Sequence, residues 1–270
     1  MEKLEHPLWI VDFVNAVLGP PVKAALEALG FHIKAEHGIV IPNYLVMVML
    51  LVAVLTALSL IIRSRLSVEN PGRLQILFED AVTALLNLLE EWIGPKGRNF
   101  LPLIGTFGIF ILFANYMGLV PGLMSPTSNI NVTLGCAITT WVYYHYQGVK
   151  AQGIVNYVKH FAMPPGSPAA LAPLMLIIEI ISHLSRVMSL SLRLFGNIFG
   201  EEMVILIIGG LVPFLFPLPF MFLGLITGGL QAFIFVLLSI IYLQAAVAVE
   251  HEHDAHGHDA PTGHHAPAAA

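Results

Sequence analysis

Charged side chains are scarce in this sequence, where Asp, Glu, Lys and Arg together make up 11% of 270 residues. Apolar residues make up 57% of the chain, and the mean hydropathy is +0.80. A soluble domain of this length could not bury so much apolar surface, so the composition excludes an ordinary soluble protein. The few Lys and Arg residues form no basic patch with interleaved aromatic residues, which argues against nucleic-acid binding. The sequence therefore predicts a polytopic membrane protein in a lipid bilayer.

The sequence also predicts neither a disulfide framework nor a cleavable leader. The single cysteine, Cys136, lies in an apolar run, so we expect no internal disulfide and a small buried hydrophobe at this position. The N-terminus lacks a basic start followed by an apolar run and a small-residue cleavage site, so we expect no removable signal peptide. No internal repeat is detectable. The apolar segments are therefore the main guide to the fold.

Long apolar runs predict five membrane-crossing helices in an all-α protein. The first run, Tyr44 to Ile62, has no charge over 19 residues, enough to cross a hydrocarbon core of about 30 Å at roughly 1.5 Å per residue. Residues 74–93 carry acidic pairs between apolar positions at helical spacing, which predicts one amphipathic helix on the cytoplasmic surface. The five spans are expected at residues 44–62, 100–120, 130–146, 174–211 and 221–249.

The last two spans are longer than a vertical crossing requires. Residues 174–211 contain no proline, and a helix of 38 residues would be roughly 57 Å long, nearly twice the hydrocarbon thickness. Such a helix must be tilted or bent. The proline-rich run 212–220 then predicts a turn. We therefore expect the two helices to form a long tilted hairpin.

Lys and Arg are distributed unevenly among the predicted loops. Seven lie in the loops after the first and third spans, three precede the first span, and none lies in the other loops. Because short basic loops stay in the cytoplasm, the N-terminus is expected outside and the C-terminus inside. The predicted divisions are an outer N-terminal extension (1–41), a single membrane domain (42–250) and a His-rich cytoplasmic tail (251–270).

One face of the fourth span is polar, although the rest of that helix is apolar. At about 100° per residue, six polar side chains fall within about 40° of one line. An ionisable residue inside a span is costly and is a functional-site hypothesis by default, so Arg193 is the first candidate. The six residues of this polar face are Glu179, Ser182, Arg186, Ser189, Arg193 and Asn197.

Arg193 has no acid near it on the polar face. Glu179, the only acid there, lies roughly 21 Å from Arg193 along the helix axis, too far for an ion pair. An internal salt bridge could join Glu179 to Arg186 instead, but their roughly 10 Å of rise requires nearly full extension of both side chains. A fixed cation in the membrane needs an anion or water beside it. We therefore expect the counter-charge of Arg193 to come from another chain.

Further polar candidates lie around Arg193. Glu202 lies nine residues later, on the opposite face and roughly 13 Å further outward, where it can line an outward-opening aqueous pocket or be a plain interfacial acid. His183 is either a packing histidine or a proton carrier, and Asn115 serves either packing or an ion path. Gln231, in the last span, shares a face with two glycines that permit close helix packing.

Three segments, in this order, resemble signatures of subunit a of the F-type ATP synthase membrane sector. The resemblance covers about residues 40–250 and implies a stator subunit that is not an enzyme by itself and needs no cofactor. It also implies a bacterial inner-membrane location, with a ring of c subunits, the b subunits of the peripheral stalk and the other ATP synthase subunits as partners. The segments are LIGTFGIFILFANYMGLVPG at 103–122, LRLFGN at 192–197 and LQAFIF at 230–235.

The resemblance also implies roles for single residues. In this family the arginine of LRLFGN faces the rotating c ring, whose subunits each carry a membrane-buried carboxylate, and two offset half-channels lead protons to and from the ring. Arg193 matches this essential coupling arginine. The implied proton pathway comprises Asn197, Glu202 and Gln231 toward the outside, Glu179 and Ser182 toward the inside, and Ser189 and His183.

Two positions depart from the family pattern. Gly224 stands where some relatives carry His, seven residues before the glutamine of the last span, and Asn129 stands where some carry Asp. The outer path is therefore expected to depend on Glu202. The sequence leaves open whether the transported ion is H⁺ or Na⁺, because the ion-binding carboxylate belongs to the c subunit.

Functions of other classes remain as alternatives. A secondary transporter of cations or metals is suggested by the histidine-rich run 251–265, but the paired repeats and broken midplane helices common in such transporters are not detectable. The run could bind zinc or nickel, or it could be a solvated terminus, and we assign no metal site to it. A purely structural membrane anchor would leave Arg193 unexplained.

Overall fold

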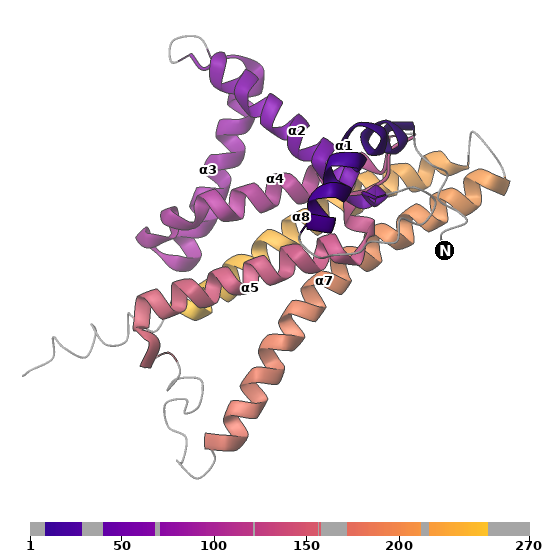
Figure 1. Ribbon diagram of the computed structural model, residues 1–270. Coiled ribbons are helices and arrows are strands. Elements are labelled where there is room, and N and C mark those ends of the chain that lie inside the picture. The colour runs from indigo at the N-terminus through magenta and orange to yellow at the C-terminus, as the bar shows by residue number, and fades with distance from the viewer. Residues whose placement is uncertain are drawn as a thin grey trace, which may run out of the picture.

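The computed structural model describes residues 9–28, 40–67, 71–120, 122–155, 157, 172–211 and 216–247. No β-strand occurs in these ranges, and the predicted all-α class is confirmed (Figure 1). In chain order the elements are α1 (Trp9–Ala28), α2 (Asn43–Ser64), α3 (Arg73–Ile93), η3 (Pro95–Phe100), α4 (Leu101–Met117), η4 (Pro126–Ser128), α5 (Ile130–Gln152), α7 (Ala172–Leu211) and α8 (Pro217–Val247).

The ends of the helices follow local sequence signals. Gly94 ends α3 with a φ of 85°, and Gly153 ends α5 with a φ of 79°, a backbone region that glycine enters at little cost. At the start of α5, the side-chain oxygen of Asn129 accepts a 3.0 Å hydrogen bond from the N–H of Asn131. Asn129 is therefore the N-cap of α5.

The most enclosed helix of the bundle is α8, which packs against α3, α4, α5 and α7. Buried apolar side chains form three clusters that follow one another along α4, at Ile104, at Ile111 and at Ala114. The first two join α4 to the helices around α8, and the third joins α4 to α1 and α2. Cys136 lies in the middle cluster and is buried, as predicted for a small hydrophobe. Because lipid is as apolar as the helix surfaces, this close packing, rather than exclusion from water, holds membrane helices together.

The first two helices cover one end of this bundle. The side-chain oxygen of Asn15 in α1 accepts hydrogen bonds from the N–H groups of Val40 and Ile41, at 3.0 and 2.9 Å, and its amide donates to the carbonyl of Ile41. These contacts hold α1 against the start of α2. Farther along α2, Leu60 and Ile61 are 59% and 53% exposed, which suits a lipid-facing surface.

Five helical segments are long and apolar enough to cross a membrane, but they differ from the predicted five. The third predicted span, now α5, is not among them, because its Thr, Tyr and His residues lower its mean hydropathy. The amphipathic helix predicted at residues 74–93 is found as α3. Helix α1, placed by the sequence in the outer extension, is among the five. The five segments that could cross a membrane are α1, α2, residues 95–117, α7 and α8.

The long C-terminal hairpin is confirmed. Helix α7 has 40 residues and α8 has 31, and the two pack against each other. In Figure 1, α7 changes direction partway along and then runs beside α8 toward their connection, while its first part stands away from α5 and α8. The helix begins two residues earlier than predicted, and α8 includes Pro217 and Pro219, which a first helical turn tolerates. The tail 251–270 lies outside the described residues.

Candidate functional site

The polar face of α7 begins half-buried and becomes exposed toward the middle of the helix. Glu179 and Ser182 are half-buried, whereas Ser189, Arg193 and Asn197 are exposed. The neighbouring face of the same segment, about 100° around the helix, is fixed by apolar side chains in the middle cluster, which are packed against α4, α5 and α8. These side chains are Leu190, Leu194 and Ile198. The buried face therefore fixes the rotation of α7 and turns its polar face outward.

Arg193 is exposed, and no acid among the described residues lies beside it. Its one described hydrogen bond runs from Nη2 to Oγ of Ser189, one turn earlier, at 3.4 Å. No carboxylate of the described chain lies within ion-pair distance of the guanidinium. The fixed positive charge can therefore meet an anion that approaches from outside the chain.

Asn197 and Gln231 link the two helices of the hairpin next to Arg193. The amide of Asn197 donates a 2.8 Å hydrogen bond to the side-chain oxygen of Gln231. Gln231 is 2% exposed, whereas Asn197 is exposed. The sequence placed both residues in one pathway, and the structure brings them into contact.

A cavity of about 340 Å³ lies between α7 and α8, beyond this pair. Its volume is sufficient for several water molecules, and its wall has amide, hydroxyl and carboxyl groups that can bind them. The polar groups among its lining residues are those of Asn197, Glu201, Thr227 and Gln231. Such a cavity can hold water at a place where the two helices would otherwise exclude it.

Glu201, which the sequence interpretation did not select, is the acid of this cavity. Its Oε2 accepts a 3.1 Å hydrogen bond from the hydroxyl of Thr227 in α8. A Cβ atom at Gly224 would coincide with the carboxyl group of Glu201. The missing side chain at 224 therefore provides the space for this carboxyl group. The glycine at this position of the last span was the available sequence signal.

Glu202, the predicted acid, is bound elsewhere and does not line the cavity. Its Oε1 accepts a 2.7 Å hydrogen bond from the backbone N–H of Ser125, in the segment between α4 and α5. A Cβ atom at Gly118 would lie 2.7 Å from the same oxygen. Glu202 is therefore enclosed between the end of α4 and the start of η4.

Hydrogen bonds continue from this segment to α8. The hydroxyl of Ser125 donates to the carbonyl of Ala114 and lies 2.7 Å from the hydroxyl of Thr127. Thr127 donates to the side-chain oxygen of Asn115 at 2.7 Å, and the Asn115 amide donates to the carbonyl of Gly228 at 2.9 Å. Of the two roles open for Asn115, the geometry favours packing.

A second polar cluster lies at the other end of the polar face. Nδ1 of His183 lies 2.7 Å from the hydroxyl of Tyr144 in α5, and its Nε2 lies 3.1 Å from Oε1 of Glu179. Arg186 does not reach Glu179, and its guanidinium carbon instead lies 5.5 Å from the ring centroid of Tyr242 in α8. The internal Glu179–Arg186 bridge considered from the sequence is therefore not formed.

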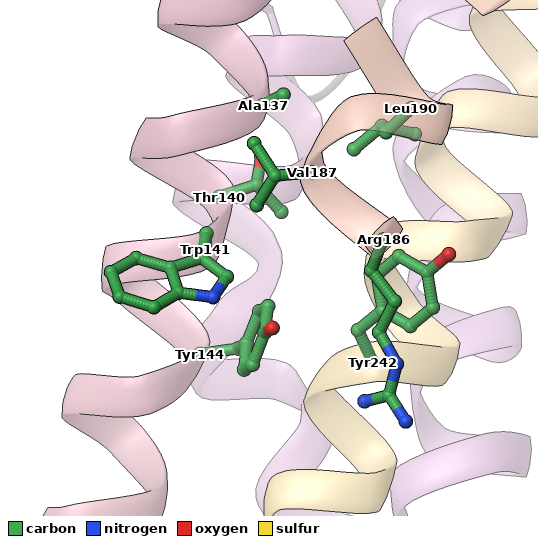
Figure 2. Close-up of a pocket in the computed structure, with 8 residues that line it drawn as sticks. All are labelled: Ala137, Thr140, Trp141, Tyr144, Arg186, Val187, Leu190 and Tyr242. Atoms are coloured by element: carbon green, nitrogen blue, oxygen red, sulfur yellow. The ribbon is translucent and has the colours of Figure 1, made fainter. Parts of the chain in front are cut away.

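The surroundings of Arg186 leave little free space. Figure 2 shows Arg186 and Tyr242 side by side, across from Trp141 and Tyr144 of α5. The cavity between them has a volume of about 10 Å³, enough for about one water molecule.

Ring contacts around His183 extend past the end of α5, through His145 to Tyr157. The ring centroids of His145 and His183 are 4.7 Å apart, and Nδ1 of His145 lies 2.6 Å from the hydroxyl of Tyr157. Burial, with a smaller contribution from the charge of Glu179, raises the pKa of Tyr157 to about 12. The Tyr157 hydroxyl therefore stays neutral at ordinary pH.

Apart from Glu202 and Ser189, the predicted residues fall into two groups on either side of Arg193. Asn197 and Gln231 lie at the cavity, and Glu179 and His183 contact each other at the opposite end. Ser182 lies near the second group without a described hydrogen bond to it, and Ser189 contacts Arg193. A fixed cation thus separates a cavity with polar side chains in its wall from a cluster of titratable side chains.

Comparison with known sequences gives a consistent match. The sequence model of the family described as ATP synthase A chain matches residues 44–244. The chain is 43% identical over 248 residues to "ATP synthase subunit a" of Citrifermentans bemidjiense, covering 92% of this chain and 99% of that protein. It is 45% identical over 246 residues to the protein of the same name from Geotalea uraniireducens, covering 91% and 99%.

Proposed function

Because this chain belongs to the ATP synthase A chain family, we propose that it is the stator subunit whose Arg193 couples ion flow to rotation of the c ring. The subunit does not itself catalyse ATP synthesis. The observation that carries the proposal is that Arg193 lies exposed on α7 with no carboxylate of the described chain beside it. Family membership argues against the secondary-transporter alternative.

The coupling follows from the cost of charge in lipid. A carboxylate of the c subunit can turn into the bilayer only when it is protonated, since an isolated buried carboxylate is strongly disfavoured. Beside the guanidinium of Arg193, the ionised form of that carboxylate is stabilised instead. The proton is therefore released near Arg193, and each passing c subunit must exchange its proton there.

Two offset half-channels complete the proposal. The cavity with Asn197 and Gln231 serves as the outer one, supported by its volume and by the polar side chains in its otherwise apolar wall. The inner one ends at Glu179, Ser182 and His183, supported by the titratable cluster at that end. Arg193, with Ser189 beside it, lies between them and repels a proton that would pass directly from one to the other.

The same proposal places the chain in the bacterial inner membrane, with its N-terminus outside and its C-terminus in the cytoplasm. Its relatives are bacterial, and the helices that could cross a membrane support a polytopic protein. In this orientation the contacts of Asn15 hold α1 at the outer end of α2. The partners are the c ring, the b subunits of the peripheral stalk and the remaining ATP synthase subunits.

The test is ATP-driven acidification of inverted membrane vesicles that contain the whole complex. We expect Arg193→Ala to abolish acidification while the complex stays assembled, because the fixed cation is lost. Arg63→Ala, at the end of α2, is the matched control and should retain acidification. Normal acidification by Arg193→Ala would overturn the proposal. Repeating the assay with and without sodium distinguishes H⁺ from Na⁺ as the coupling ion.

A further inference from the structure

Glu201 and Glu202 are adjacent in the sequence but have different neighbours. Successive residues of an α-helix point about 100° apart, so two neighbouring side chains meet different surroundings. Glu201 contacts α8 at Gly224 and Thr227, whereas Glu202 contacts the segment between α4 and α5 at Ser125. Both acids are half-buried, so exposure alone does not distinguish them.

We propose that these acids have separate roles, with Glu201 exchanging the transported proton in the outer cavity and Glu202 acting as a positioning residue for the segment between α4 and α5. The inference rests on the proposed function and names the acid that its outer half-channel uses. Glu201 thus takes the role in the outer path that was expected of Glu202 from the sequence.

The case for Glu201 is its access to water. A group that exchanges protons must reach water or another carrier in both of its protonation states. Glu201 lines the cavity of about 340 Å³ together with Asn197 and Gln231. Its described hydrogen bond comes from the hydroxyl of Thr227, which can rotate to donate to a carboxylate or to accept from a carboxylic acid. Both protonation states of Glu201 can therefore be accommodated.

The position of Glu201 along α7 suits the route to Arg193. It lies eight residues beyond Arg193, roughly 12 Å along the helix axis, and Asn197 lies halfway between them. The Asn197 amide already contacts Gln231 at the wall of the cavity. Water bound by these polar groups can carry a proton from Glu201 toward the c subunit.

The case for Glu202 is its fixed acceptor role. A backbone N–H can only donate, so the Ser125 N–H requires an acceptor oxygen at all times. Ser125 is 2% exposed, and without Glu202 its N–H would lose its described partner in a buried place. The hydroxyl of Ser125 also supports the network that runs through Thr127 to Asn115. Glu202 therefore holds a segment whose Thr127 hydrogen-bonds to Asn115, the residue that in turn bonds α4 to α8.

The test is a matched pair of isosteric substitutions in the assembled complex. Glu201→Gln keeps the shape but cannot titrate, whereas Glu202→Gln keeps an oxygen that can accept from Ser125. We expect Glu201→Gln to slow ATP-driven acidification by about 100-fold, the scale of a lost proton-transfer group, and Glu202→Gln to slow it by about twofold at most. Equal loss in both variants, or a larger loss in Glu202→Gln, would overturn the inference.

Two further variants keep the result interpretable if a single substitution impairs assembly. Glu202→Ala should lower the amount of the chain recovered with the complex, whereas Glu202→Gln should not. Glu201→Gly combined with Gly224→Glu returns a carboxyl group to the same cavity from α8 and should restore acidification above the level of Glu201→Gly alone. Failure of the double variant to exceed Glu201→Gly in a normally assembled complex would count against the inference.

Arg193→Ala separates this inference from the proposed function. If Arg193→Ala pumps normally, the proposed function fails, whatever the two acids do. If Arg193→Ala does not pump and Glu201→Gln pumps normally, only the assignment of Glu201 fails. Measuring ATP hydrolysis in parallel shows that the catalytic part of the complex is intact in each variant.

Discussion

The side chain of Asn197 on α7 donates a 2.8 Å hydrogen bond to the side chain of Gln231 on α8. The two residues are 34 positions apart, and each belongs to one of the motifs on which the family resemblance rests. Their contact lies at the wall of the cavity, one turn from Arg193. The hydrogen bond therefore fixes the two helices of the hairpin at the place where the proposed outer path reaches the arginine.

The first prediction concerns this hydrogen bond. Asn197→Ala and Gln231→Ala should each destabilise the hairpin. A double-mutant cycle on thermal unfolding should give a coupling energy of about 0.6 kcal/mol and no more than about 1.7 kcal/mol, the average and the maximum measured for hydrogen bonds between membrane helices. The control is Asn197→Ala combined with Thr139→Ala, because these two residues have different hydrogen-bond partners. The effects of these two substitutions on stability should be additive. Additivity in the Asn197 and Gln231 pair would contradict the contact.

The second prediction concerns the space at Gly224. Gly224→Ala should displace the carboxyl group of Glu201, because the new methyl group would occupy its position. A displacement of about 1 Å can cost about 100-fold in rate, so acidification should fall by up to this factor while assembly is retained. Gly135→Ala in α5, where a Cβ atom meets nothing within 4 Å, is the matched control. Equal rates in the two variants would show that this space is not needed.

The third prediction concerns Asn115, which is 4% exposed and joins η4 to α8. Asn115→Leu keeps a similar volume but leaves the carbonyl of Gly228 and the hydroxyl of Thr127 without these partners. An unsatisfied buried polar group costs about 1 to 3 kcal/mol. The melting temperature of this subunit, purified on its own, should therefore fall. Thr139→Val, which removes one exposed hydrogen bond within α5, should change it little. An unchanged melting temperature in Asn115→Leu would argue against this network.

The fourth prediction concerns Tyr157 and pH. Burial, followed by the charge of Glu179, disfavours its ionised form, so its pKa is about 12 rather than the usual value of about 10. Since the folded-state pKa is raised, Tyr157 contributes stability that is fully present below about pH 10 and is lost as the pH rises through about 12. The phenolate difference spectrum between the unaltered chain and Tyr157→Phe should show no signal at pH 10. A half-titrated signal there would contradict the burial of this hydroxyl.

Much of the helical organisation was predictable because it depends on local periodicity. The length of α7 and the proline-rich run after it predicted the hairpin, and the acidic pairs between apolar residues predicted α3. The boundaries differ by a few residues, since prolines fit the first turn of α8. The structure differs from the prediction at α1 and α5. Helix α1 is apolar enough to cross a membrane although it was assigned to the outer extension, and α5 is not apolar enough although it was predicted as a span. Hydropathy measures compatibility with lipid, and α5 carries polar residues that are buried against other helices.

The sequence by itself determined that Arg193 has no acid near it on its own helix, because the rise of 1.5 Å per residue sets distances along a helix without reference to any other element. It also determined which residues share the polar face of α7. Only the tertiary structure distinguished the surroundings of Glu201 from those of Glu202. Their contacts depend on whether Gly224 or Ser125 lies opposite, and both come from segments distant in the sequence. Packing between helices sets those contacts, and no periodicity within α7 encodes them.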